Sequence, residues 1–158
     1  MLKSVLHPAD AARARVLGVD ALIVSNHGGR QLDGALSPLR ALPGILATAG
    51  DLPVMIDSGF RRGTDVLKAM ALGAAFVFIG RPFAYAAAVG GEAGVAHAID
   101  LMQAEIRRDM ALLGITRLDQ LGRDHLAALT MLGERGLTQP TATSAREPHT
   151  DRTQHDQP

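Results

Sequence analysis

The sequence predicts an α/β protein built around a parallel sheet. Short apolar runs alternate with longer helical patterns four times, at roughly 20 to 30 residues per repeat, which is the pattern of successive βαβ units. Polar and glycine-rich segments follow the predicted strands. The composition agrees with a tightly packed α/β core, because 47% of the residues are hydrophobic and 17 residues are glycine.

The first two predicted strands enclose a helix. Residues 2–6 predict the tail of a strand, which His7-Pro8 breaks. The Ala- and Arg-rich residues 10–17 form a helix that Gly18 closes, since glycine readily adopts the left-handed conformation that ends helices. Residues 21–24 are apolar and partly β-branched, as expected of a short buried strand.

The second predicted helix covers residues 38–49. Ser37 supplies an N-cap, and Pro38 takes the first helical position, where its missing N–H leaves no hydrogen bond unmade. Gly50 ends the helix, and the pair 43–44, Pro-Gly, is a candidate break inside it.

The third and fourth predicted strands again enclose a helix. They cover residues 53–57 and 75–79, two apolar runs that end in polar or glycine-containing segments. The helix between them covers residues 64–71 and ends at Gly73.

The last part of the chain is predominantly helical. A short helix covers residues 83–88, Gly-Gly at 90–91 interrupts it, and a long helix covers 94–113. A small helical piece follows at 118–129, and the polar, proline-containing residues 136–158 predict a disordered tail. The long helix has apolar residues at three- and four-residue steps: Val95, Ile99, Met102, Ile106, Met110 and Leu113.

The polar segments fall at residues 25–30, 57–62 and 80–81, each after the carboxyl end of a predicted strand. In a βα barrel, that face carries the chemistry. A complete barrel needs about 250 residues, so four strands would form half of one. An open doubly wound sheet is the alternative, although no Gly-x-Gly-x-x-Gly segment follows the first strand.

Composition excludes several classes of protein. The formal net charge is zero, and the 3% of aromatic residues form no stacking platform, so nothing indicates a nucleic-acid partner. No apolar run approaches the roughly 20 residues that span a bilayer. The chain has no cysteine, which excludes disulfides and thiolate metal sites and is compatible with a reducing cytoplasm. We predict no metal site.

The loop after the second strand carries two candidate functional side chains. His27 is a candidate proton acceptor, and Arg30 is a candidate clamp for a carboxylate. The strand that ends at Val24 would deliver both of them to the same edge of the sheet.

Two later loops predict a phosphate site. The loop 57–63 has glycines, two arginines and a following helix N-terminus, where the helix dipole favours an anion. Gly80 and Arg81 offer a similar pair after the next strand. Asp57 is acidic, so its expected partners are a ribityl hydroxyl or the loop itself.

Three of these segments carry a resemblance to a known family. They are Ser25-Asn26-His27-Gly28-Gly29-Arg30-Gln31-Leu32-Asp33, Asp57-Ser58-Gly59-Phe60-Arg61-Arg62-Gly63, and residues 72–82 with Gly80-Arg81-Pro82. They resemble the FMN-dependent 2-hydroxy acid dehydrogenases and oxidases, the family of L-lactate dehydrogenase, glycolate oxidase and mandelate dehydrogenase. The resemblance covers about residues 2–126. It implies the C-terminal half, about strands five to eight, of a (βα)8 TIM barrel over residues 1–130.

The resemblance also implies roles for individual residues. His27 would be the catalytic base, and Arg30 would bind the substrate carboxylate. Lys3 would lie near N1 and O2 of the flavin, and Ser25 would contact the flavin. Ser58 departs from a glycine that is common in part of the family. The ribityl chain and phosphate would be held by Asp57, Ser58, Gly59, Phe60, Arg61, Gly80 and Arg81.

The implied activity is FMN-dependent oxidation of an L-2-hydroxy acid, such as lactate, to the 2-oxo acid. The electron acceptor stays open between oxygen, a quinone and a cytochrome, and so does the choice between hydride and carbanion chemistry. The resemblance implies a homo-oligomer in the cytoplasm, with peripheral attachment to the inner membrane as a variant.

In the family, the N-terminal half supplies a second arginine, tyrosines and the aspartate that orients the histidine. We therefore expect a C-terminal fragment with little activity alone. The alternatives are a non-catalytic FMN- or phosphate-binding half-barrel and a subunit that completes a barrel with a partner.

Overall fold

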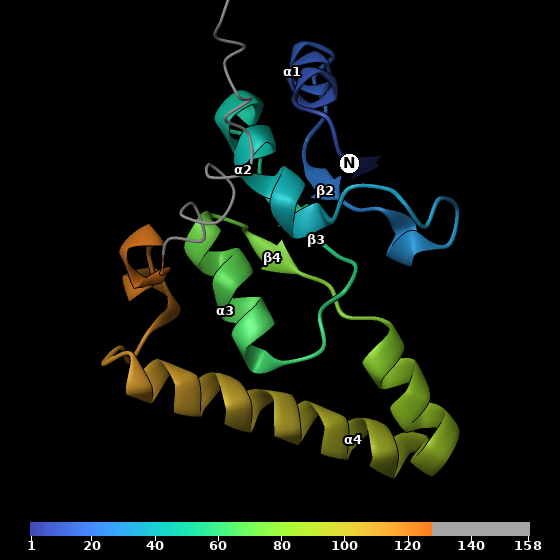
Figure 1. Ribbon diagram of the computed structural model, residues 1–158, viewed down its shortest axis with the longest axis vertical. Helices are drawn as coiled ribbons and strands as arrows, with labels where there is room; N and C mark the ends of the chain where they lie inside the picture. The colour runs from blue at the N-terminus through green and yellow to red at the C-terminus, as the bar shows by residue number, and fades with distance from the viewer. Residues whose placement is uncertain (128–158) are drawn as a thin grey trace, which may run out of the picture. The chain divides into compact units, whose positions relative to one another are not determined.

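The computed structural model describes residues 1–127, in which strands and helices alternate (Figure 1). The strands are β1 (Leu2–Val5), β2 (Leu22–Val24), β3 (Val54–Ile56) and β4 (Phe76–Val77). The helices are α1 (Pro8–Val16), α2 (Pro38–Ala49), α3 (Gly63–Leu72) and α4 (Arg81–Leu112). Three short 3-10 turns complete the elements: η1 (His27–Gly29), η2 (Leu118–Gln120) and η3 (Arg123–His125).

The four strands form one parallel sheet in the order β1-β2-β3-β4. This confirms the predicted α/β class with a parallel sheet. Consecutive strands are neighbours throughout, so residues 1–127 contain no reversal of strand order of the kind that defines a doubly wound sheet. All four carboxyl ends therefore point to the same edge of the sheet.

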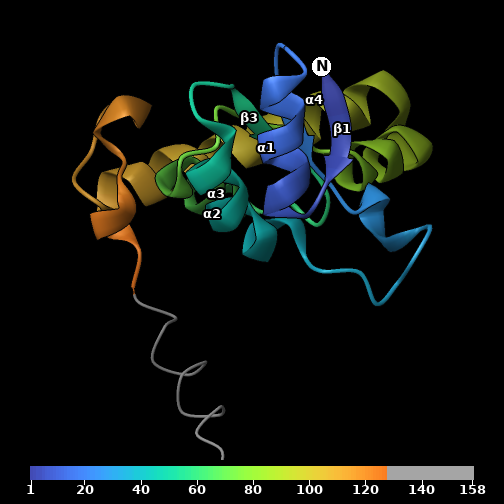
Figure 2. The same ribbon diagram turned by 90° about the horizontal axis from the view of Figure 1, so that it is seen from above.

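The hydrophobic core lies between one face of the sheet and the helices α1, α2 and α3. Leu22, Val24 and Ile56 are fully buried on the sheet side, and Leu42 and Ile45 are fully buried on α2. Each such side chain contributes about 1.5–3 kcal/mol by leaving water. Small residues let α1 and α2 lie side by side (Figure 2), namely Ala11, Ala14, Ala41 and Ala49.

The other face of the sheet is partly exposed. Strand register aligns Lys3, Ile23, Met55 and Phe76 across the four strands, so their side chains share this face. Phe76 is 54% exposed and contacts the ring of Phe78 at a centroid distance of 4.9 Å. Residues 1–127 thus leave apolar surface open on the side of the sheet away from its core.

The helix α4 differs from the two separate helices predicted at 83–88 and 94–113. It runs from Arg81 to Leu112 as one element, with a backbone break at Gly91 (φ 55°, ψ −139°). The chain changes direction there (Figure 1). A Cβ atom at Gly94 would lie 2.2 Å from the carbonyl oxygen of Ala86, so glycine is needed where the two segments meet.

Helix starts also differ in detail from the predictions. The first helix begins at Pro8, before the predicted residue 10, because the His7 imidazole accepts a hydrogen bond from the Ala9 N–H and caps it. The second begins after Ser37 as predicted, but the Ser37 hydroxyl makes no capping hydrogen bond. That helix continues through Pro43, so the candidate break at 43–44 was wrong.

The segment after α4 is less helical than predicted. Residues 118–127 form the two 3-10 turns η2 and η3 instead of an α-helix. Residues 128–129 of that predicted piece and the predicted disordered tail 136–158 lie outside the described residues. Among the described residues, no helix has the length and apolar character needed to cross a membrane.

Candidate active site

A pocket of about 320 Å³ lies at the carboxyl ends of the strands, at the lower end of the size range of small-molecule sites. Every residue predicted for the site except Ser25 lines it. The predicted lining residues are Lys3, His27, Arg30, Asp57, Ser58, Gly59, Phe60, Arg61, Gly80 and Arg81. Gly28, Phe78, Ile79 and Pro82 also line it, although the sequence predicted no role in the site for them.

The histidine loop begins where β2 ends. Ser25 is fully buried beneath the loop, and its hydroxyl accepts a hydrogen bond of 3.0 Å from the His27 backbone N–H. His27, Gly28 and Gly29 all have positive φ (55°, 68° and 74°), which explains the two glycines in the motif. The side chain of Asn26 has a buried oxygen, Oδ1, without a hydrogen-bond partner among the described residues.

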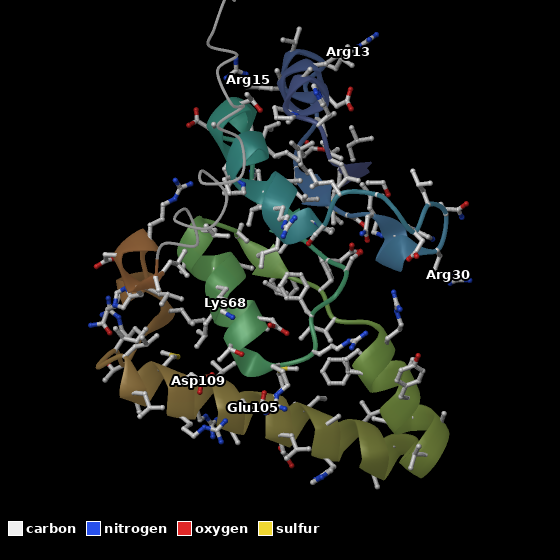
Figure 3. All side chains as sticks on the ribbon, in the orientation of Figure 1. Arg13, Arg15, Arg30, Lys68, Glu105 and Asp109 are labelled. Atoms are coloured by element: carbon white, nitrogen blue, oxygen red, sulfur yellow. The ribbon has the colours of Figure 1, made fainter. Side chains whose placement is uncertain are left out.

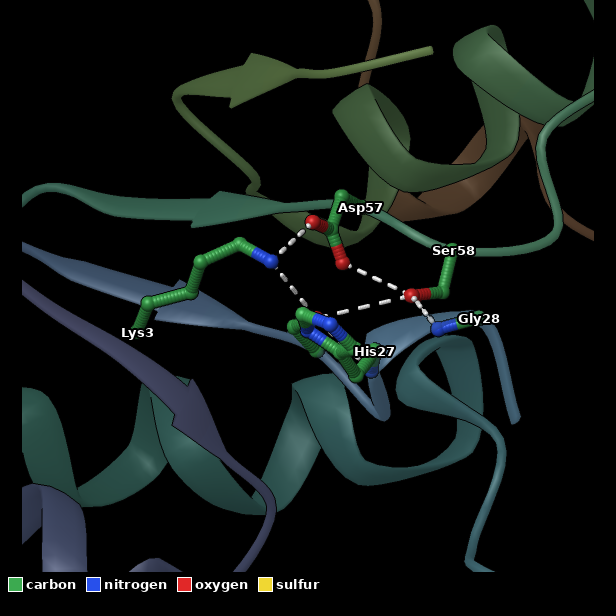
Figure 4. Close-up of polar contacts among 6 residues, drawn as sticks. Lys3, His27, Gly28, Asp57 and Ser58 are labelled. Carbon is green, nitrogen blue, oxygen red and sulfur yellow. Dashed lines mark hydrogen bonds and ion pairs between the residues drawn. The ribbon is translucent and has the colours of Figure 1, made fainter. Parts of the chain in front are cut away.

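The end of β3 supplies a polar network (Figure 4). The Asp57 carboxylate lies 2.8 Å from the Lys3 ammonium and accepts a 2.7 Å hydrogen bond from the Ser58 hydroxyl. Lys3 also donates to the Ser25 hydroxyl at 3.4 Å. A side chain of β1 is thereby linked to the side chains that directly follow β2 and β3. Asp57 thus makes the loop-stabilising contact that was one of its two expected roles.

The pKa of Asp57 lies below its usual value. Partial burial raises this pKa, but hydrogen bonds from Lys3 and the two neighbouring serines, together with the Lys3 charge, outweigh the effect of burial. Asp57 is therefore ionised at neutral pH and remains paired with Lys3.

The arginines lie at different parts of the rim. Arg30 and Arg61 are exposed side chains of the pocket wall, and Figure 3 shows Arg30 on the loop that follows η1. Arg81, at the first position of α4, donates a hydrogen bond to the carbonyl oxygen of Gly28. Four cationic side chains and one carboxylate line the pocket, so its electrostatics favour an anion.

The N-terminus of α3, where the sequence predicted an anion site, is occupied by the protein itself. The Gly63 N–H donates a 2.7 Å hydrogen bond to the Glu105 carboxylate of α4, which also pairs with Arg62 at 2.7 Å. Asp65 accepts from the backbone N–H groups of residues 61 and 62. These three backbone N–H groups therefore already have partners within the chain, and the phosphate site predicted for this loop stays a prediction.

Glu105 was missed in the sequence because 42 residues separate it from Gly63 and no local pattern marks it. Figure 3 shows it on the side of α4 that faces α3. The pKa of the Glu105 carboxyl lies below its usual value. The main cause is the hydrogen bond from the Gly63 N–H, and the hydrogen bond and charge of Arg62 lower it further.

The N-terminus of α4 is the second helix end next to a loop for which the sequence predicts phosphate contacts. Arg81 begins this helix, and Gly80 precedes it. A Cβ atom at Gly59 or Gly80 would meet no atom within 4 Å, so both backbones border open space. A phosphate group could approach these two backbones closely, because no side chain intervenes.

This fold and pocket define a class of protein: α/β proteins with an imidazole and several cationic side chains around one pocket at the carboxyl ends of parallel strands. The sequence pattern of the FMN-dependent dehydrogenases matches residues 1–128. The chain belongs to this family, which confirms the resemblance carried by its three motifs.

Individual relatives are similar at high identity. An L-lactate dehydrogenase of Stenotrophomonas maltophilia (strain K279a) is 52% identical over 130 residues, which are 82% of this chain and 34% of that protein. An L-lactate oxidase of Nostoc sp. (strain PCC 7120) is 51% identical over 127 residues, which are 80% of this chain and 35% of that protein.

Solved structures confirm the fold. A soluble mutant of the membrane-associated (S)-mandelate dehydrogenase from Pseudomonas putida superposes with a TM-score of 0.76 at 46% identity, over 80% of this chain and 36% of that one. A mandelate oxidase variant with a monooxide FMN adduct superposes with a TM-score of 0.71 at 43% identity, over 76% of this chain and 39% of that one. This chain spans about a third of the length of the relatives it matches.

Proposed function

We propose that this chain forms the C-terminal half, about strands five to eight, of a (βα)8 barrel that oxidises an L-2-hydroxy acid to the 2-oxo acid with FMN. The observation that carries the proposal is the convergence of His27, Arg30, Arg61 and Arg81 on one pocket. The consecutive strand order and the one-third share of the relatives' length support the half-barrel. L-Lactate is the proposed substrate, since the similar dehydrogenases and oxidase carry its name.

The residues present fit FMN. Gly59 and Gly80 leave open space beside their backbones, and Arg61 and Arg81 provide charge for the phosphate. Lys3 and Ser25 would lie beside the ring system. When bound, FMN supplies the two-electron acceptor. Contacts to the ribityl chain and phosphate are assigned to Asp57, Ser58, Gly59, Phe60, Arg61, Gly80 and Arg81.

Substrate binding and proton transfer are assigned to two side chains of this chain. The Arg30 guanidinium would bind the substrate carboxylate through charge-assisted hydrogen bonds worth about 1.5–3 kcal/mol. A ring nitrogen of His27 would accept the proton of the substrate hydroxyl, a contribution of about 10²–10⁴-fold. His27 is exposed on the rim, where a substrate can reach it.

The electron acceptor, the oligomeric state and the cellular location are proposed by similarity to the relatives. An oxidase and several dehydrogenases are similar to this chain, so oxygen, a quinone and a cytochrome are all candidate acceptors. A homo-oligomer in the cytoplasm is proposed, with peripheral membrane attachment as in the monotopic mandelate dehydrogenase.

The exposed sheet face favours a second candidate function for this chain in isolation. Phe76 and Phe78, 54% and 40% exposed, lie on the side of the sheet away from the core. We infer that the chain alone turns over slowly, as an FMN-binding half-barrel that gains full activity with the rest of a barrel.

An FMN titration followed by flavin fluorescence tests the cofactor assignment. We expect Arg61→Ala and Arg81→Ala to weaken binding about 10-fold or more, since each removes a charge-assisted hydrogen bond. Arg62→Ala is the matched control, because Arg62 pairs with Glu105 outside the pocket. Equal affinity for all variants would overturn the phosphate assignment.

A second experiment tests the reaction. With FMN in excess and oxygen excluded, L-lactate should bleach the flavin slowly, and His27→Ala should abolish the bleaching. Arg30→Met should raise the lactate concentration required, because it removes the carboxylate's partner. Bleaching that survives in the His27 variant at the same rate would remove His27 from the mechanism.

A further inference from the structure

Two serine hydroxyls hold the backbone of the histidine loop from different strands (Figure 4). The Ser25 hydroxyl accepts from the His27 N–H, and the Ser58 hydroxyl accepts from the Gly28 N–H, both at 3.0 Å. Ser25 belongs to the same loop as His27. Ser58 lies 30 residues after Gly28, at the end of β3. Its hydroxyl therefore joins the histidine loop to the neighbouring loop.

The hydrogen-bonding direction of Ser58 is set by Asp57. The Ser58 hydroxyl donates its single proton to Asp57 Oδ1 at 2.7 Å, and Lys3 holds the other carboxylate oxygen at 2.8 Å. A hydroxyl has one donor and two lone pairs. With its proton committed to a carboxylate, the Ser58 oxygen faces Gly28 as an acceptor.

The backbone at Ser58 is unusual for a residue with a side chain. Its φ is +75°, in the left-handed region that favours glycine, and Gly59 follows with φ +89°. A serine is strained at this position, whereas a glycine would not be. An outlier of this kind persists where its surroundings hold it and is a reason to look for function.

We propose that Ser58 is a positioning residue for His27: its hydroxyl, oriented by Asp57, holds the Gly28 N–H and thereby fixes the backbone that carries the imidazole. The consequence for catalysis rests on the proposed role of His27 as base. The backbone clamp itself does not depend on that role. This role is additional to the contact with the ribityl chain and phosphate that the resemblance implies for Ser58.

The test compares Ser58→Ala with Ser58→Gly in the full chain, which at 16.6 kDa is suited to NMR. Both variants lack the hydroxyl, but only alanine keeps a Cβ in the left-handed conformation. We expect amide hydrogen exchange at Gly28 to accelerate about 5- to 10-fold in both, the loss expected for one hydrogen bond. The His27 ring resonances should shift in both variants. Ser37→Ala is the control, because Ser37 is exposed and its hydroxyl caps nothing.

The outcomes distinguish a hydrogen-bond clamp from an effect of backbone strain. Unchanged Gly28 exchange in Ser58→Gly overturns the clamp, and so does acceleration confined to Ser58→Ala, which would indicate backbone strain instead. The glycine variant relieves that strain, so a folding failure of the alanine variant leaves the experiment decisive. In lactate oxidation by the FMN-loaded chain, both variants should lower kcat at least 5-fold with little change in KM. Faster exchange with unchanged kcat would keep the clamp and overturn its positioning role.

Discussion

Substituting Gly63 by alanine should separate α3 from α4. A Cβ atom at this position would lie 2.7 Å from the Glu105 Cβ and 2.7 Å from the Ile106 backbone nitrogen. Ordinary contacts between such atoms are about 3.5–4.0 Å, so one helix must move by about 1 Å. The backbone of α4 cannot rotate away as a flexible side chain would.

The expected cost follows from that displacement. Overpacking of this size costs about 1–3 kcal/mol, and for a domain of this size it lowers Tm by roughly 5–15 °C. Thermal unfolding followed by far-ultraviolet circular dichroism measures the change. The displacement also lengthens the 2.7 Å hydrogen bond from Gly63 to Glu105. The pH dependence of the variant's unfolding stability should therefore change as well as its Tm.

Gly90→Ala is the matched control. A Cβ atom there meets nothing within 4 Å, and Gly90 lies within α4 without a positive φ. Alanine should therefore leave stability unchanged or raise it by about 0.5–1 kcal/mol, because it has the higher helix propensity. If Gly63→Ala unfolds at the same temperature as the wild type, the close α3–α4 contact does not exist as described.

Three further predictions concern charge and exposed surface. Asp57→Asn should lower the unfolding free energy in urea by about 1–2 kcal/mol, since Lys3 loses its ionised partner; an unchanged midpoint would show that the pair contributes nothing. The lowered pKa of Glu105 makes its contribution complete above the ordinary carboxyl pKa and lost as the pH falls through the lower folded-state value. Wild-type stability should therefore fall between about pH 5 and pH 3, and Glu105→Gln should reduce that slope, as measured by urea unfolding across this range. Phe76→Ser should reduce self-association in sedimentation at high protein concentration, because Phe76 is 54% exposed, and should change Tm by less than about 2 °C.

The control for the acid prediction is Asp51→Asn, since Asp51 is exposed and lies outside α3 and α4. Its pH profile should follow that of the wild type. An equally steep acid slope in Glu105→Gln would mean that other carboxyls govern acid unfolding.

The arrangement also explains how a chain of this length can bring so many candidate functional residues to one pocket. Parallel strands in consecutive order bring three separate loops to one edge, so His27, Arg30, Arg61 and Arg81 share a pocket although 54 positions separate the first from the last. The exposed face beneath Phe76 indicates what a completed barrel would still have to cover.

The sequence by itself determined the parallel α/β class and the set of loops that form the pocket. Both follow from local information: the alternation of apolar strands with helical patterns, and the polar segments that follow strands whose carboxyl ends must meet. His27, Arg30 and the Gly80-Arg81 turn could be selected on that basis alone.

Only the tertiary structure decided which groups bind one another. Glu105 takes the helix end expected to bind an anion, Arg81 reaches Gly28, and Ser58 clamps the same loop, across 42, 53 and 30 residues of sequence. The physical reason is that a carboxylate, guanidinium or hydroxyl has many possible partners in a sequence. Its actual partner is the one that helix and strand packing places within about 3 Å.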